Sequence, residues 1–150
     1  MRLFHLLLGC LFLPSMLSAQ GHLAGLWQGE ITFGGLHNAS SYPFELFLEL
    51  DGDVLRGRTY IHLGKDDILE MEVIGRLYYD RSLSLKEYKF IPVEGSKAMP
   101  PFTRIYQMIY TRSIFDSTLE GYWQQDRIDP FNQKRDRGRI RLVKKEATKA

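Results

Sequence analysis

The sequence contains almost no cysteine: Cys10 is the single one among 150 residues. Because Cys10 lies in an apolar N-terminal segment, a chain cleaved after that segment has no thiol. That excludes disulfides, thiolate nucleophiles and thiolate metal sites. The sequence also lacks a phosphate-binding glycine loop and a Gly-x-Ser-x-Gly nucleophile elbow. The histidines after residue 20 are scattered, without the spacing of metal ligands, so we expect no metal and no cofactor.

The net charge is also small, +2 at pH 7, and does not indicate a nucleic-acid partner. The charge is unevenly distributed, because residues 127–150 hold nine Lys or Arg against three Asp or Glu. Period-two alternation places Arg137, Arg139 and Arg141 in one outward row. We regard this row as a candidate site for a polyanion of the cell envelope. The alternative is a cross-strand ladder with acidic strands, for example through Glu30.

Residues 1–20 have the pattern of a secretory signal peptide: Met1-Arg2, an apolar stretch over 3–17, then Ser18-Ala19-Gln20. The apolar stretch is about 15 residues, shorter than the roughly 20 of a spanning helix, which disfavours an uncleaved anchor. A rival interpretation is a lipobox at 7–10 that would make Cys10 a lipidated N-terminus. We predict export to the periplasm, the cell surface or the medium, with no transmembrane segment in the mature form, and one domain over residues 21–150.

The mature chain is rich in period-two alternation of apolar and polar residues, which is typical of half-buried strands. The alternation predicts about eight strands, at 25–33, 44–50, 54–63, 68–78, 82–91, 102–112, 119–125 and 137–144. Short connections between consecutive strands predict an antiparallel meander. Such a chain either closes into a barrel or splits into a two-sheet sandwich. Glycines inside the strands favour the barrel, since sharply coiled strands bend at such positions.

Gly25-Leu26-Trp27, at the start of the first strand, resembles the Gly-x-Trp signature of the lipocalins and the wider calycin group. The resemblance implies an eight-stranded barrel whose closed end is plugged by the tryptophan and whose open mouth holds a small, mostly apolar molecule. In that group a late-strand arginine packs across the tryptophan, and Arg139 and Arg141 are the candidates here. The C-terminal helix usual in lipocalins is not evident in this sequence.

Five residues on predicted inward faces are candidates for ligand contact. Trp27 and Trp123 either line a cavity or plug the core. Tyr106 and Tyr110 offer phenol hydroxyls on one face of their strand. Glu87 continues the inward face of Leu83 and Leu85, where it could bind a polar head group or act as a general acid or base. Alternatively, a bulge turns Glu87 outward and brings Tyr88 and Phe90 inward.

Three functions are consistent with these features. The first is an exported lipocalin-like barrel that binds a small apolar or amphipathic molecule without catalysis. The second is a filled barrel that docks on an envelope polyanion or protein through its basic C-terminal strand. The third is a small enzyme that uses Glu87. A barrel filled by its own side chains argues against the first.

Overall fold

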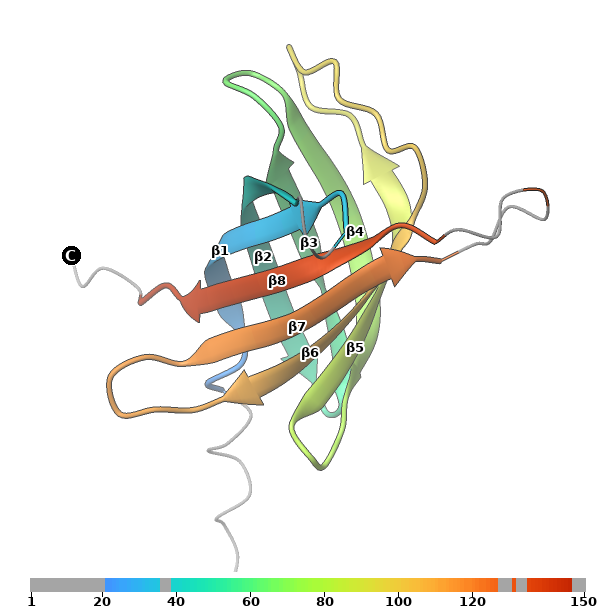
Figure 1. The fold of residues 1–150 in the computed structure, drawn as a ribbon. Helices are drawn as coiled ribbons and strands as arrows, with labels where there is room; N and C mark the ends of the chain where they lie inside the picture. The colour runs from blue at the N-terminus through green and yellow to red at the C-terminus, as the bar shows by residue number, and fades with distance from the viewer. Residues whose placement is uncertain (1–20, 36–38, 127–130, 132–134, 147–150) are drawn as a thin grey trace, which may run out of the picture.

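The described part of the chain folds into eight antiparallel strands. A computed structural model describes residues 21–35, 39–126, 131 and 135–146, so the predicted signal peptide and Cys10 lie outside the described residues. The strands are β1 (Gly25–Phe33), β2 (Ser40–Asp51), β3 (Val54–His62), β4 (Ile68–Leu77), β5 (Ser82–Ile91), β6 (Arg104–Thr111), β7 (Thr118–Gln125) and β8 (Arg137–Lys144). Each pairs with the next, and β8 pairs with β1, which closes the barrel (Figure 1). The predicted closed meander is confirmed, and the sandwich alternative is wrong.

Burial along the strands follows the predicted alternation. In β2, for example, Phe44, Leu46 and Leu48 are at most 1% exposed, and their polar neighbours lie outside. The strand begins at Ser40, earlier than the sequence predicts. Residues 40–43 pair with residues 30–33 of β1, so tertiary pairing extends β2 beyond its own alternating pattern. None of the described residues belongs to a helix that could span a membrane.

The inward glycines permit close approach of neighbouring strands. A Cβ atom on Gly57 would lie 1.9 Å from the carbonyl oxygen of Phe47, and one on Gly75 would lie 1.8 Å from that of Ser84. No side chain fits at such distances, so these positions require glycine. This is the role that the sequence predicts for the strand glycines.

The barrel has two ends, which we name after the tryptophan that each contains. The Trp27 end holds the start of β1, the end of β8 and the connections at 52–53, 78–81 and 112–117. The Trp123 end holds the start of β6, the end of β7 and the longer connections, including 92–103. In Figure 1 the β4–β5 and β6–β7 connections of the Trp27 end both lie on the lower side of the barrel, the first near the centre and the second to the left.

Candidate functional site

Glu87 points into the barrel, where its residue is 0% exposed. A β-bulge is present, but it follows Glu87 and therefore does not turn that residue outward. Val73 pairs with Glu87 and Glu72 pairs with Lys89, which leaves Tyr88 as the extra residue. Tyr88 is therefore outside, 56% exposed, and Phe90 returns to the inside. The alternative, with Glu87 outside and Tyr88 inside, is wrong, because the bulge comes after Glu87 in the strand.

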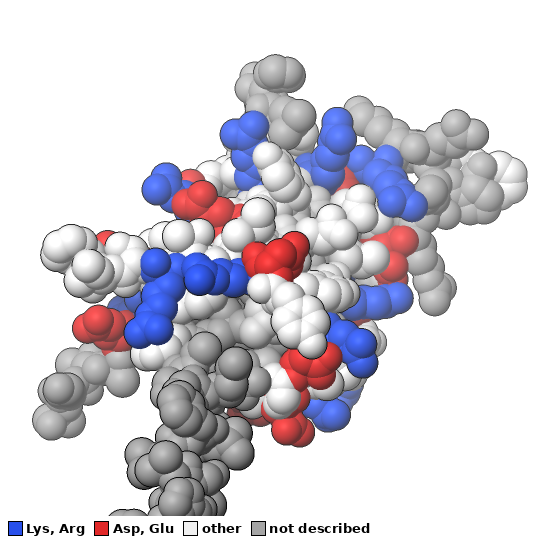
Figure 2. Space-filling model, turned by 90° about the horizontal axis from the view of Figure 1, so that it is seen from below, with Lys and Arg blue, Asp and Glu red and all other residues white. Residues whose placement is uncertain are grey.

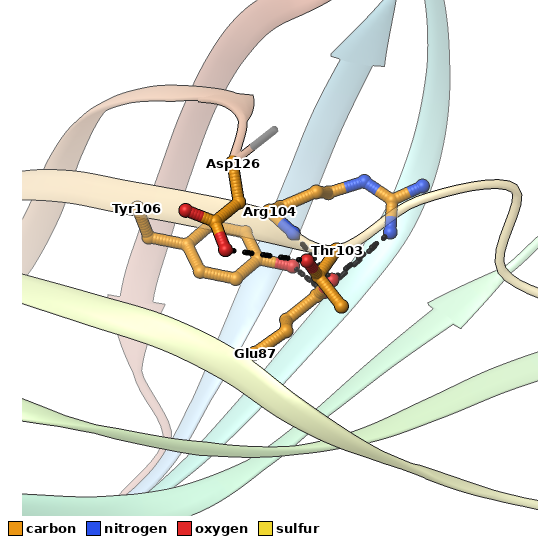
Figure 3. A network of polar contacts seen from close by, with 5 residues as sticks. All are labelled: Glu87, Thr103, Arg104, Tyr106 and Asp126. Atoms are coloured by element: carbon orange, nitrogen blue, oxygen red, sulfur yellow. Dashed lines mark hydrogen bonds and ion pairs between the residues drawn. The ribbon is translucent and has the colours of Figure 1, made fainter. Parts of the chain in front are cut away.

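The Glu87 carboxylate takes the place of a backbone acceptor where the hydrogen-bond ladder between β5 and β6 ends. Strand pairing between β5 and β6 ends at Lys86 and Ile105. The next amide, that of Arg104, donates its hydrogen bond to Glu87 Oε2 at 2.8 Å instead of to a β5 carbonyl. Arg104 Nη1 lies 3.4 Å from the same oxygen, and the Tyr106 hydroxyl donates to Oε1. Figure 3 shows the Arg104 and Tyr106 side chains and the Arg104 amide converging on this carboxylate.

Burial dominates the electrostatics of this cluster. It raises the pKa of Glu87, and the Arg104 guanidinium and Tyr106 hydroxyl offset only part of that effect. Burial, followed by the neighbouring Glu87 charge, raises the pKa of Tyr106 well above its ordinary value. A buried ion pair contributes little net stability, because desolvation cancels most of the Coulombic attraction. Removing either partner, in contrast, leaves an uncompensated buried charge.

Arg104 lies in a cage of aromatic rings at the Trp123 end. Its guanidinium carbon is 5.0 Å from the ring centroid of Phe102 and 5.3 Å from those of Phe33 and Trp123. Trp123 is itself fixed by a hydrogen bond from Nε1 to the carbonyl of Thr32 at 2.9 Å. The planar guanidinium stacks on such rings, which a lysine ammonium does less well. One donor is left over, since Arg104 Nε has no hydrogen-bond partner among the described residues.

Polar contacts close the structure above this cluster. Asp126, after β7, accepts a hydrogen bond from the Thr103 hydroxyl at 3.5 Å and pairs with Lys86 Nζ at 2.9 Å (Figure 3). The 92–103 connection is held by Ser96, whose hydroxyl accepts from the amide of Ile68 and donates to the same residue's carbonyl. The Glu87 side chain is consequently sealed from solvent. A general acid or base must reach its substrate, so this geometry does not favour catalysis by Glu87.

At the Trp27 end a second tryptophan forms an apolar plug. Trp27 is 0% exposed, donates from Nε1 to the carbonyl of Leu23 and meets the Tyr110 ring edge-on at 5.9 Å. The cation across its ring is Lys144, whose Nζ is 4.9 Å from the ring centroid. The two arginines considered for that position, Arg139 and Arg141, are both exposed instead. The cation here comes from the last residue of β8, where the resemblance to lipocalins had implied an arginine.

The structure therefore divides the five predicted ligand contacts between two places. Glu87, Tyr106 and Trp123 belong to the Trp123 end, whereas Trp27 and Tyr110 belong to the other. Tyr106 stacks on Phe44 from across the barrel, with centroids 5.9 Å apart, so the middle of the barrel is occupied by side chains. Sequence reasoning missed Arg104, although extending the inward face of Tyr106 back by two residues identifies it.

The arginine row lies outside, as predicted. Arg137, Arg139 and Arg141 are exposed and alternate with the buried Gly138, Ile140 and Leu142. The ladder alternative holds for one of the three: Arg141 pairs with Glu120 of β7 at 3.2 Å. Arg141 is also the β8 residue paired with Glu30 of β1, but the Glu30 carboxylate accepts a hydrogen bond from the Ser41 hydroxyl. Among the described residues, Arg137 and Arg139 form no ion pair, so two cations of the row remain available.

Two adjoining hollows lie beside this row on the outside of the barrel. The larger, about 850 Å³, extends over β5, β6, β7 and β8, and the smaller, about 410 Å³, continues it along β7 and β8. They share Gln107, Tyr122 and Arg139. Short side chains, Ser82 and Ser84, form part of the larger hollow. We call the two hollows together the outer-face site.

Comparisons with models of protein families, with curated proteins and with solved structures found no match to this chain. The eight-stranded barrel does not by itself identify a lipocalin. Function must therefore be argued from the two sites described above.

Proposed function

We propose that this protein is an exported, non-catalytic binding protein that holds an anionic ligand in the outer-face site. The observation that carries the proposal is that Arg137 and Arg139 are exposed, unpaired within the described residues, and border the hollows. Residues two apart on a strand are about 6.7 Å apart, so the two guanidiniums lie in line along β8. An extended ligand with repeated negative charges is complementary to that spacing.

The other side chains of the outer-face site narrow the ligand class. Tyr122 is 57% exposed and offers a ring face, and Gln107 and Gln124 offer amide donors and acceptors. A peptide that adds a strand to the sheet is disfavoured, because a closed barrel has no free edge to pair with. Hydroxyl-rich acidic chains match the combination of guanidinium, amide and aromatic groups. An acidic polysaccharide is therefore the proposed ligand class.

The test uses polygalacturonate as probe and neutral dextran as ligand control. Wild-type protein is expected to bind polygalacturonate and not dextran, with affinity that falls when ionic strength rises from about 0.05 M to about 0.3 M. Arg139→Glu is expected to weaken binding about tenfold, which corresponds to about 1.4 kcal/mol. The matched control is Arg112→Glu, an equal change of net charge at an exposed position away from the hollows.

Equal loss of affinity in Arg139→Glu and Arg112→Glu contradicts the proposal, because it shows that binding depends on the net charge of the protein and not on the position of the arginine. Binding that is indifferent to salt contradicts it as well. Both arginines are exposed, so neither substitution removes a buried contact, and circular dichroism verifies that each variant stays folded.

A second candidate, the small-molecule carrier, is supported by one observation at the Trp123 end. Arg104 Nε is a buried donor without a described partner, close to the rings of Phe33, Phe102 and Trp123. An amphipathic molecule with an acceptor oxygen would satisfy that donor, provided that the side chains around it give way. Native mass spectrometry of the exported protein before and after organic extraction tests this candidate. Loss of a discrete small mass supports it, and an identical mass before and after removes its support.

A further inference from the structure

The connections at the Trp27 end carry apolar side chains that contact almost nothing. Tyr79, on the β4–β5 connection, is 109% exposed, and Ile114 and Phe115, on the β6–β7 connection, are 96% and 87% exposed. Single exposed apolar residues are ordinary on protein surfaces. Three large ones lie at the tips of two connections that follow each other around the same end, and exposed apolar groups gathered at one end of a molecule mark interaction surfaces.

Backbone hydrogen bonds hold these connections in place. The carbonyl of Arg81, next to the Tyr79 turn, accepts from the amide of Tyr110 at the end of β6, at 2.9 Å. The carbonyl of Ser117 accepts from the amide of Lys144 at 2.9 Å, which ties the β6–β7 connection to β8. Asp80 accepts from both the amide and the hydroxyl of Ser82, which closes its own turn. The tips are thus attached to the rigid wall of the barrel.

Charge at this end does not favour a strongly charged partner. Figure 2 views the molecule from the side of these connections and shows Lys and Arg interspersed with Asp and Glu, without one broad region of either sign. A surface with mixed charge and protruding apolar tips is complementary to a neutral surface with an accessible apolar layer. Aromatic and aliphatic side chains enter the interfacial region of a lipid bilayer in this manner.

The position of the chain start is consistent with the same partner. Residues 21–24 lead into β1 at the Trp27 end, so the apolar segment over residues 3–17 precedes this end of the barrel in the chain. A retained segment, or a lipid on Cys10, would bring the Trp27 end toward the bilayer, whereas a cleaved chain would dock through its connections alone.

We propose that the Trp27 end docks on a lipid bilayer by inserting Tyr79, Ile114 and Phe115 into its interfacial region. The outer-face site then remains exposed on the barrel wall, above the membrane surface. This inference is independent of the polysaccharide proposal, since none of the three side chains lines the outer-face site.

The experiment is flotation of residues 21–150 with phosphatidylcholine vesicles. Wild-type protein is expected to float with the vesicles, at low and at high salt alike, because insertion of apolar groups is not screened. Phe115→Glu is expected to lower the partition coefficient about tenfold. Met99→Glu is the matched control, an exposed apolar residue (75%) on a connection at the opposite end, and it is expected to float like wild type.

A second variant supplies a direct readout. Phe115→Trp adds an exposed indole, whose emission is expected to shift to the blue on adding vesicles and to be quenched by brominated lipid. Absence of vesicle binding by wild type, or equal loss in Phe115→Glu and Met99→Glu, overturns the proposal. A concentration-dependent dimer that Phe115→Glu abolishes, without vesicle binding, overturns it in favour of a second copy of the chain.

Discussion

The two ends of the barrel place a cation over a buried tryptophan, yet the two arrangements differ in polarity. At one end Lys144 lies 4.9 Å from the Trp27 ring, and at the other Arg104 lies 5.3 Å from the Trp123 ring. Lys144 is half-buried at the rim, where burial lowers its pKa. Arg104 is 2% exposed, and its charge is compensated by Glu87.

The difference shows how one fold closes its ends by two physical means. The Trp27 end relies mainly on apolar packing, and its cation keeps access to solvent while Nζ donates a hydrogen bond to the Ala24 carbonyl. The Trp123 end buries an ion pair, which costs desolvation and is tolerated because the carboxylate also accepts the Arg104 amide and the Tyr106 hydroxyl. Stability at the Trp123 end therefore depends on complete polar pairing, whereas the Trp27 end tolerates loss of a polar group.

The largest expected contrast is between the two cations. Arg104→Met leaves Glu87 buried without its counter-charge and is expected to lower the free energy of unfolding by about 3–5 kcal/mol. Lys144→Met removes a half-exposed cation–π contact and the hydrogen bond from Nζ to the Ala24 carbonyl, and is expected to cost about 1–2 kcal/mol. Urea denaturation of both variants measures the two values. Similar values for the two variants would contradict the distinction between the ends.

A smaller contrast is expected between the two tyrosines. Tyr106→Phe removes a donor from the Glu87 carboxylate and is expected to cost about 1–3 kcal/mol, because the buried Oε1 then keeps only the 3.5 Å contact from Arg104 Nη1. The Tyr110 hydroxyl has no partner among the described residues, so Tyr110→Phe is expected to be neutral or slightly stabilising. Thermal denaturation compares the pair. A larger loss in Tyr110→Phe would show that the Trp27 end also contains a required polar contact.

The smallest effect concerns pH. Since burial raises the pKa of Glu87 above its ordinary value of 4.5, its contribution to stability is fully present below about pH 4.5. That contribution is lost as pH rises through the raised folded-state pKa. Glu87→Gln does not titrate, so the stability of wild type relative to this variant is expected to fall from pH 4.5 upward. Denaturation midpoints measured from pH 4 to pH 8 test the sign, and a rise of wild type relative to Glu87→Gln would contradict it.

Period-two alternation was sufficient to predict the eight strands, their inward faces and the outward direction of Arg137, Arg139 and Arg141. It was not sufficient for Glu87, because the position of a bulge depends on how β4 and β5 pair and not on β5 alone. Its partner Arg104 lies on another strand, and no pattern within either strand joins them. The outer hollows could not be predicted, since four strands contribute their walls.

Side chains fill the middle of the barrel, and we propose that the ligand binds outside it. Nuclear magnetic resonance tests the claim directly by following backbone amides and methionine methyl groups during titration with polygalacturonate. We expect saturable shifts for the amides of Tyr122 and Arg139, with the methyl signals of the buried Met71 and Met108 unchanged. Shifts of the Met71 and Met108 methyl signals, with Tyr122 and Arg139 unmoved, would contradict it.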